Sequence, residues 1–136
     1  DVCALFNAGF ELDVTALDAE EKKAMQEAAA LFGNMQPLVA HGRFIRLNPS
    51  VAPAQWIGWM LEDNRRAVIA YFRPYCGQEA AYWTIPLHGL DRLARYRDTR
   101  TGMVLTGADW EALGLHPTWR DGDYFSELIT LEKIQK

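Results

Sequence analysis

Apolar residues recur at helical spacing in the first third of the chain, at positions i, i+3, i+4 and i+7. The residues concerned are Met25, Ala28, Ala29 and Phe32. Asp18 is placed to cap the N-terminus of this helix, and Glu21, three residues later, is its capping-box partner. Gly33-Asn34 is a suitable C-cap. The pattern therefore predicts one amphipathic helix over residues 15–32.

After residue 35 the pattern changes to short β-rich runs separated by turn residues. Strands are expected at 38–47, 55–61, 66–73, 80–87, 92–97, 103–106 and 124–134. Residues 62–65 read as a hairpin connection, residues 99–102 as a turn, and residues 109–113 as one helical turn. This spacing predicts a mainly β domain, an antiparallel β-sandwich of Greek-key type preceded by one α-helix.

Two of the expected strands are apolar on both sides. Trp56 and Trp59 are three residues apart, so their side chains should point to opposite faces of a strand. Residues 67–72 are apolar at every position, and such strands are usually covered on both faces. Either the cover of one face is missing, and the chain then binds a dye such as ANS, or loops or the N-terminal helix cover that face.

Composition narrows the classes of partner. The 136 residues are 49% hydrophobic, enough for one core, and the net charge of -4 leaves no basic face for a nucleic acid. No apolar run is long enough to span a bilayer, so no membrane partner is expected. Cys3 and Cys76 are far apart and are expected to be free thiols, which favours a reducing compartment and a cytoplasmic location.

Glycosidase chemistry needs two carboxylates at a defined separation. Six aspartates fall in predicted turns or at strand ends, where Asp accepts hydrogen bonds from nearby amides. They are Asp63, Asp91, Asp98, Asp109, Asp121 and Asp123. Turn formation accounts for them, and no catalytic residue is predicted in this chain.

The sequence contains no motif for metal binding or for nucleophilic catalysis either. The histidines are His41, His88 and His116. They form no H-x-x-x-H pair, so neither a metal nor another cofactor is expected. Ser50 and Ser126 do not lie in a G-x-S-x-G motif, and nothing in the sequence near Cys76 indicates a lowered thiol pKa.

Aromatic residues are the remaining signal for binding. Trp110 and Trp119 lie in connections rather than in the middle of strands, so they are the candidates for carbohydrate contact. Aromatic rings also fill β-sheet cores, and core or interface packing is the alternative for both residues.

Short motifs follow one another along almost the whole chain. They are residues 9–13 (GFELD), 20–22 (EEK), 38–47 (LVAHGRFIRL), 63–68 (DNRRAV), 87–91 (LHGLD), 96–97 (YR) and 112–115 (ALGL). In this order they resemble glycoside hydrolase family 36, the α-galactosidases. Phe10 stands where the family usually has tyrosine, and Ile45 where it has an aromatic residue.

The resemblance implies a retaining exo-glycosidase with an N-terminal β-domain, a (β/α)8 barrel and a C-terminal antiparallel sandwich. Residues 1–35 would be the end of the catalytic barrel, with its last helix, and residues 36–136 the C-terminal domain. The family's catalytic pair is two aspartates on barrel strands, the nucleophile in a K-W-D motif. This sequence has no such motif, so no catalytic residue is transferred to it.

Two functions of different classes follow. The first is a non-catalytic accessory domain that packs on the catalytic barrel of an α-galactosidase acting on substrates such as melibiose and raffinose, and that could help a homo-oligomer assemble. The alternative is an autonomous carbohydrate-binding module. The lone N-terminal helix and the start at Asp1 lead us to expect a C-terminal fragment of a longer protein. A small independent enzyme has no group of residues to support it.

Overall fold

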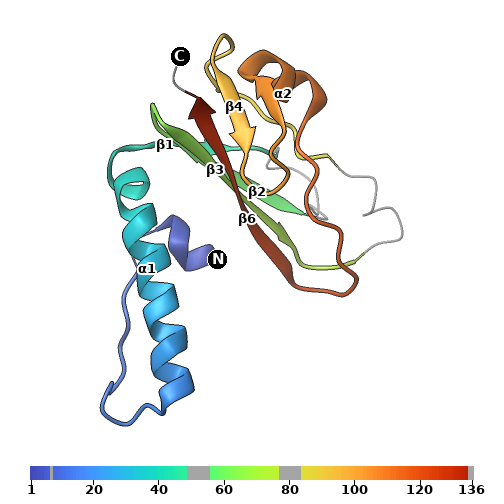
Figure 1. Cartoon of the computed structure of the whole chain (residues 1–136). Coiled ribbons are helices and arrows are strands. Elements are labelled where there is room, and N and C mark those ends of the chain that lie inside the picture. Colours follow the sequence, from blue (N-terminus) through green and yellow to red (C-terminus); the bar gives the residue numbers. More distant parts are fainter. Residues whose placement is uncertain (7, 49–55, 77–83, 135–136) are drawn as a thin grey trace.

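The computed structural model describes residues 1–6, 8–48, 56–76 and 84–134, and its strands form an antiparallel sheet with a long helix beside it (Figure 1). The helical elements are η1 (Val2–Leu5), α1 (Ala19–His41) and α2 (Gly107–Leu113). The strands are β1 (Arg43–Arg46), β2 (Ile57–Glu62), β3 (Arg66–Arg73), β4 (Arg95–Asp98), β5 (Val104–Thr106) and β6 (Phe125–Ile134).

The strand order is β1-β2-β3-β6-β4-β5, and every pairing is antiparallel. β3 and β6 are the two middle strands of this sheet. β3 pairs along its whole length with β6, from Arg66 opposite Glu132 to Arg73 opposite Phe125. The expected mainly β, antiparallel class is therefore confirmed, with six strands in the described residues.

The strand predictions vary in accuracy along the chain. β3 was predicted at both ends, and Asp63 closes the hairpin before it by accepting hydrogen bonds from the amides of Arg65 and Arg66. The turn at 99–102 and the helical turn at 109–113 are also present, the latter within α2. Of the strand expected at 80–87, residues 80–83 lie outside the described residues, and Ile85 forms only an isolated bridge with Leu115.

The predicted end of the N-terminal helix is wrong. The capping box at Asp18 and Glu21 is present, but α1 continues through Gly33-Asn34 and Pro37 to His41, so the strand expected from residue 38 begins at Arg43. Met35 and Leu38 are buried on the sheet. Burying such side chains contributes about 1.5–3 kcal/mol each, comparable to the roughly 3 kcal/mol that a proline costs inside a helix.

Both faces of the sheet carry a core. On one face Ile69, Tyr71 and Ile129 pack with Trp110 of α2 and with Ile85 and Leu115. On the other face Val68, Ala70 and Leu61 pack with η1 and the end of α1. Trp56 packs against the first core and Trp59 against the second, as their spacing predicted. The second face is therefore covered by N-terminal elements of this chain, one of the two alternatives that the sequence left open.

Candidate functional site

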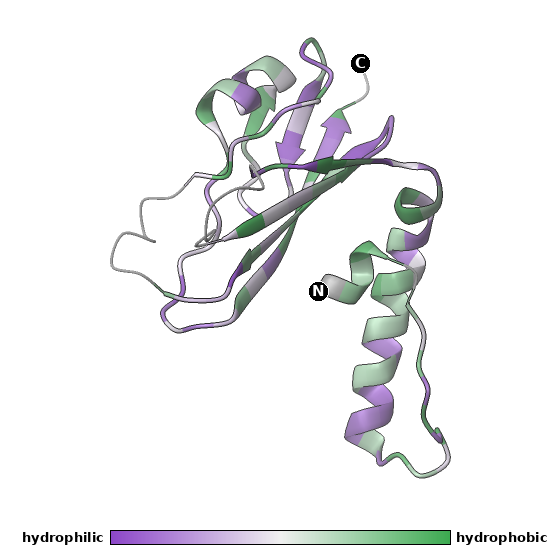
Figure 2. Cartoon of the chain, turned by 180° about the vertical axis from the view of Figure 1, so that it is seen from behind, coloured by the Kyte–Doolittle hydropathy of each residue, from purple (hydrophilic) through white to green (hydrophobic). Residues whose placement is uncertain are grey.

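Only one end of α1 contacts the sheet. Met35 and Leu38 are its buried residues, out of 23. Figure 1 shows the helix running past the sheet, with its N-terminal half projecting beyond the body and residues 8–18 alongside it. Hydrophobic residues occupy η1 and the end of α1 beside the sheet, whereas the projecting half of α1 carries both hydrophobic and hydrophilic residues (Figure 2). We call α1 and residues 8–18 together the α1 arm.

An aromatic cluster lies where the α1 arm meets the sheet. The ring centroid of Trp59 lies 5.8 Å from that of Phe6, 6.1 Å from that of Phe44 and 5.3 Å from that of Phe72. Trp59 and Phe72 are half-buried, but Phe6 and Phe44 are each 47% exposed. The outer rings of the cluster therefore face solvent.

The exposed apolar surface continues along the arm. Phe10 packs on Phe32 of α1 with ring centroids 5.7 Å apart. We define the docking face as five side chains that are each 44–49% exposed: Phe6, Phe10, Leu12, Val14 and Phe44. These apolar side chains neither donate nor accept hydrogen bonds, and their burial against another surface would be favourable.

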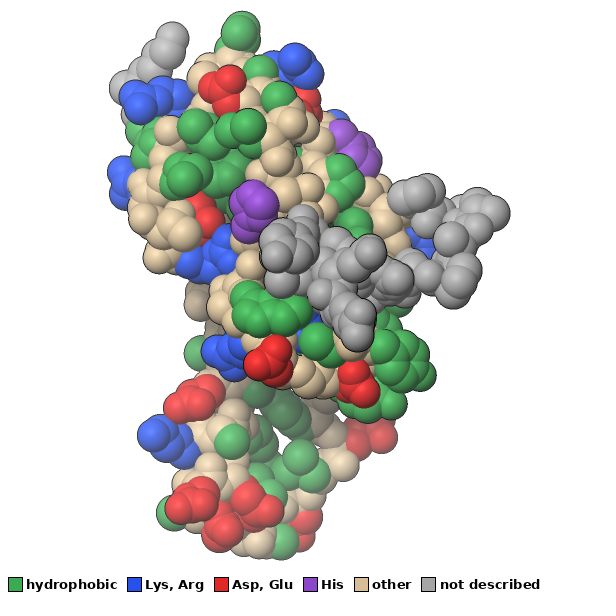
Figure 3. Space-filling view, turned by 90° about the vertical axis from the view of Figure 1, so that its right-hand side faces the viewer, with side chains coloured by type: hydrophobic (Ala, Val, Ile, Leu, Met, Phe, Trp, Pro, Cys, Tyr) green, Lys and Arg blue, Asp and Glu red, His purple; other side chains and the backbone are tan. Residues whose placement is uncertain are grey.

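The far end of the α1 arm is acidic. Glu11, Asp13, Glu20 and Glu21 are exposed there with the N-cap Asp18, and Figure 3 shows acidic side chains gathered at that end. Asp13 accepts hydrogen bonds from the hydroxyl and the amide of Thr15, which lower the pKa of its carboxyl. The arm thus combines an apolar side with an acidic tip.

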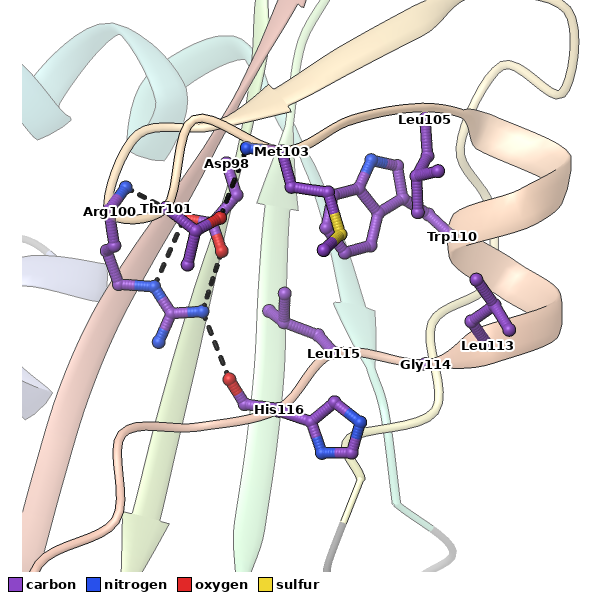
Figure 4. Close-up of a pocket in the computed structure, with 10 residues that line it drawn as sticks. All are labelled: Asp98, Arg100, Thr101, Met103, Leu105, Trp110, Leu113, Gly114, Leu115 and His116. Atoms are coloured by element: carbon purple, nitrogen blue, oxygen red, sulfur yellow. Dashed lines mark hydrogen bonds and ion pairs between the residues drawn. The ribbon is translucent and has the colours of Figure 1, made fainter.

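A second feature is a cavity of about 270 Å³ between α2 and the turn that joins β4 to β5. Figure 4 shows Trp110, Leu105 and Leu115 around it, with Met103 at one side and His116 at another. Its lining is mostly apolar. Gly114, with φ of 73°, turns the chain there from α2 into the Leu115 bridge.

The polar edge of the cavity is an ion-pair network around Arg100. Its guanidinium donates to both carboxylate oxygens of Asp98 at 3.1 and 2.8 Å, to Glu127 at 2.9 Å and to the carbonyl of His116 at 3.0 Å. Burial raises the pKa of Asp98, but the hydrogen bonds and charge of Arg100 outweigh burial and leave that pKa below its ordinary value of 3.8. The network consequently holds the turn and does not present a reactive acid.

The other aspartates also serve local structure. Asp91 accepts from the amide of Leu93 and from Lys133, Asp109 caps α2 with Thr106, and Asp123 accepts from the amide of Cys76 at 2.7 Å. No group of three or more potential metal ligands occurs in the described part of the chain. Cys3 and Cys76 are free, and no described helix is long and apolar enough to cross a membrane.

The two tryptophans proposed for carbohydrate contact lie in different environments. Trp110 is buried on α2, where its indole N–H donates to the carbonyl of Tyr96 at 3.1 Å, and its ring is reached only through the cavity. Trp119 is 44% exposed, with the guanidinium of Arg73 5.1 Å from its ring centroid, and it does not line that cavity. The structure does not place the two rings in one site.

The docking face was not recognised from the sequence. A signal for part of it exists, because apolar Phe10, Leu12 and Val14 alternate with the acidic Glu11 and Asp13. Such period-two alternation indicates an extended segment with one apolar side. Phe6 and Phe44 carry no comparable signal, since only the fold brings them together.

Known proteins resemble this chain closely. Residues 56–131 match the family described as the glycosyl hydrolase family 36 C-terminal domain. The chain is 31% identical over 132 residues to α-galactosidase AgaA of Geobacillus stearothermophilus, covering 96% of this chain and 18% of that protein. It is 32% identical over 126 residues to the Aspergillus terreus protein named Probable alpha-galactosidase G, covering 92% and 17%.

The same relationship holds for solved structures. The crystal structure of the GH36 α-galactosidase AgaA of Geobacillus stearothermophilus superimposes with a TM-score of 0.79 at 29% identity, over 93% of this chain and 18% of that chain. The chain therefore spans less than a fifth of the length of these relatives.

Proposed function

The chain belongs to the glycosyl hydrolase family 36 C-terminal domain family, and from this premise we propose that it is the non-catalytic C-terminal domain of an α-galactosidase. In this proposal the parent enzyme is a retaining glycoside hydrolase acting on terminal α-galactosides such as melibiose and raffinose. The domain packs on the catalytic barrel and stabilises it, and it is expected to need no cofactor.

The docking face is the observation that carries this proposal. Its five side chains are half-exposed on the α1 arm and at the edge of the sheet, and each gains about 1 kcal/mol if a partner surface covers the exposed half. The occupant we propose is the preceding part of a longer polypeptide. Residues 1–35, which hold four of the five docking-face side chains, then form the end of the barrel, and residues 36–136 form this domain. The docking face is in this proposal covered by the rest of the barrel, and α1 runs through the boundary as one continuous helix.

A non-catalytic role is supported by the placement of the carboxylates. Five of the six aspartates singled out above accept hydrogen bonds from turn or cap residues, and no K-W-D motif occurs in the sequence. We therefore expect the 136-residue chain to hydrolyse no α-galactoside. Turnover that survives repurification, and that is lost on mutation of one of its aspartates, would contradict this expectation.

The size of the native polypeptide tests the accessory role directly. An antibody against this domain, used on a blot of the source cells, should detect a band several times larger than 15.4 kDa. A single band at 15.4 kDa would overturn the proposal and favour the autonomous binding module.

A matched pair of substitutions tests docking in the longer protein. Leu12→Ser changes the docking face, whereas Leu93→Ser makes the same chemical change at a side chain that is 90% exposed in the turn before β4. We expect Leu12→Ser to lower the melting temperature of the longer protein by several degrees and to leave that of the 136-residue chain unchanged. Equal effects of the two substitutions in the longer protein would show that the docking face is not covered there.

The alternative function, an autonomous carbohydrate-binding module, keeps one supporting observation. Trp119 is a large exposed ring on a well-anchored turn. Trp110 contributes in this reading only if a ligand enters the cavity. A saturable change in tryptophan fluorescence with millimolar melibiose or raffinose, lost in Trp119→Ala, would favour this function over packing alone.

A further inference from the structure

The turn between Trp119 and Tyr124, which leads into β6, is held by a buried arginine. Arg73 is only 1% exposed, and its guanidinium donates to the carbonyl of Arg120 and, at 3.0 Å, to that of Gly122. The same guanidinium lies 5.1 Å from the ring centroid of Trp119. Two carbonyls and one ring are therefore fixed by a single side chain from the end of β3.

A second set of contacts joins this turn to the residues after β3. The amide of Tyr124 donates to the carbonyl of Pro74 at 2.9 Å, and Asp123 accepts from the amide of Cys76 at 2.7 Å. Tyr124 has φ of 58°, the left-handed region that side chains other than glycine and asparagine rarely adopt. Its neighbours thus hold an aromatic residue in a conformation it does not favour.

The turn before β6 and the residues after β3 expose aromatic rings to solvent. Tyr124 is 78% exposed and Tyr75 is 66% exposed, with their ring centroids 6.0 Å apart and their planes at 54°. Trp119 is exposed on the same turn. Solvent-facing rings contribute little to the core, so neither the strain at Tyr124 nor the exposure of the rings is explained by the stability of the fold. Strained residues of this kind occur at binding sites.

The surroundings of the rings are polar. Arg120 and Asp121 are exposed in the same turn as Trp119 and Tyr124. A pyranose ring matches such a surface, because its C–H face packs on an aromatic ring while its hydroxyls hydrogen-bond to phenol and carboxylate oxygens at the rim. A protein partner would favour a continuous apolar patch such as the docking face.

We propose that Tyr75, Tyr124 and Trp119 form a saccharide-binding surface, which takes neutral galactose-containing oligosaccharides. The choice of sugar rests on the proposed function. The surface lies where β3 ends and β6 begins, at the lower right of Figure 1, away from the α1 arm. Binding is expected at millimolar concentration, since the three rings are open to solvent.

The test is a titration of the 136-residue chain with raffinose, followed by amide and indole resonances in NMR. We expect saturable shifts confined to residues 73–76 and 119–125, including the indole N–H of Trp119. Tyr75→Ser and Tyr124→Asn should each weaken binding at least tenfold. Leu93→Ser, the matched change at an exposed apolar residue on another turn, should leave the affinity unchanged.

Tyr124→Gly separates binding from structure. It removes the ring and the strained conformation together, so the melting temperature should stay equal or rise while the affinity falls at least tenfold. Unchanged affinity in Tyr124→Gly and Tyr124→Asn would overturn the proposal, as would the absence of shifts at 50 mM raffinose. Neither result touches the accessory role, which the size of the native polypeptide and the Leu12→Ser comparison decide separately.

Discussion

α1 and β3 are stabilised in opposite ways. β3 buries six of its eight residues, on both faces of the sheet, whereas α1 buries two of 23. The helix is about 35 Å long and has a complete capping box, and its projecting half, which packs little, depends on such local signals. The strand has partners on both sides, in β2 and β6.

The two regions therefore have different roles: the sheet stabilises the domain, and the α1 arm exposes apolar side chains to another surface. The sheet carries its own stability in two cores. The α1 arm carries apolar side chains that nothing in the described residues covers fully, and it is the part whose surroundings should change most in a longer protein. Substitutions in the two regions should therefore have unlike effects, and the following six test how far the contrast extends.

The largest contrast is expected between Ile69→Ala and Met25→Ala. Ile69 is fully buried in β3, so its truncation should destabilise the chain by about 3–4 kcal/mol. Met25 is on the projecting half of α1, outside both cores, and its replacement by alanine should change stability by less than about 0.5 kcal/mol. Urea unfolding measures both. A large loss in Met25→Ala would mean that the arm is packed as firmly as the sheet.

The second contrast concerns two carboxylates with lowered pKa. Asp98→Asn removes the buried partner of Arg100 and should cost about 2–3 kcal/mol at pH 7. Because the folded-state pKa of Asp98 lies below 3.8, its stabilisation is present above that value and is lost as the pH falls through the folded-state pKa. The two proteins should converge in stability as the pH falls below the folded-state pKa of Asp98.

Asp13→Asn is the control on the α1 arm. The pKa of Asp13 is also lowered, but its carboxyl is exposed and accepts hydrogen bonds only from Thr15, two residues away, so the change in the unfolding midpoint should be much smaller than for Asp98→Asn and should likewise vanish below the folded-state pKa. A difference between wild type and Asp98→Asn that stays constant from pH 7 to pH 2 would contradict the role given to the Asp98–Arg100 pair.

Gly107→Ala should disturb the body of the domain. A Cβ atom at this position would lie 2.2 Å from the carbonyl oxygen of Asp91, and the Gly107 amide already donates to the carbonyl of Ala94 at 2.8 Å. Since backbone must shift to make room, the expected loss is about 1–3 kcal/mol. Thermal unfolding measures it, and an unchanged melting temperature would show that the Asp91 turn moves freely away from α2.

Gly33→Ala should give the smallest effect, of the opposite sign. Gly33 lies inside α1, and no atom comes within 4 Å of the position its Cβ would take. Alanine should therefore stabilise the helix by about 0.5–1 kcal/mol. Slower hydrogen exchange in the α1 arm, with little change in β3, is the expected result. Faster exchange in α1 would mean that this side of the helix has a close neighbour.

The sequence predicted elements whose signals are local. The capping box at Asp18, the Asp63 hairpin and both ends of β3 depend on residues close in the chain, and all are present. The end of α1 depends on Met35 and Leu38 meeting the sheet, a contact between distant segments that overrides the C-cap signal of Gly33-Asn34. No local pattern contains that information.

The candidate site residues show the same difference between local signals and contacts of distant segments. The spacing of Trp56 and Trp59 predicted opposite faces, and they pack on opposite faces although Trp56 lies one residue before β2. Buried Trp110 donates a hydrogen bond to Tyr96, and the position of Tyr124 depends on its own contact with Pro74 and on that of its neighbour Asp123 with Cys76. Such placements arise only when segments distant in sequence are brought together.

The order of strands in the sheet bears on how the protein is made. β6 is the last of the six strands to leave the ribosome, yet it lies in the middle of the sheet, between β3 and β4. Until it arrives, β1-β2-β3 and β4-β5 are two separate hairpin units with no strand to join them. A nascent chain that ends before residue 125 lacks β6 and cannot form the complete sheet. The domain therefore folds only after β6 has been translated.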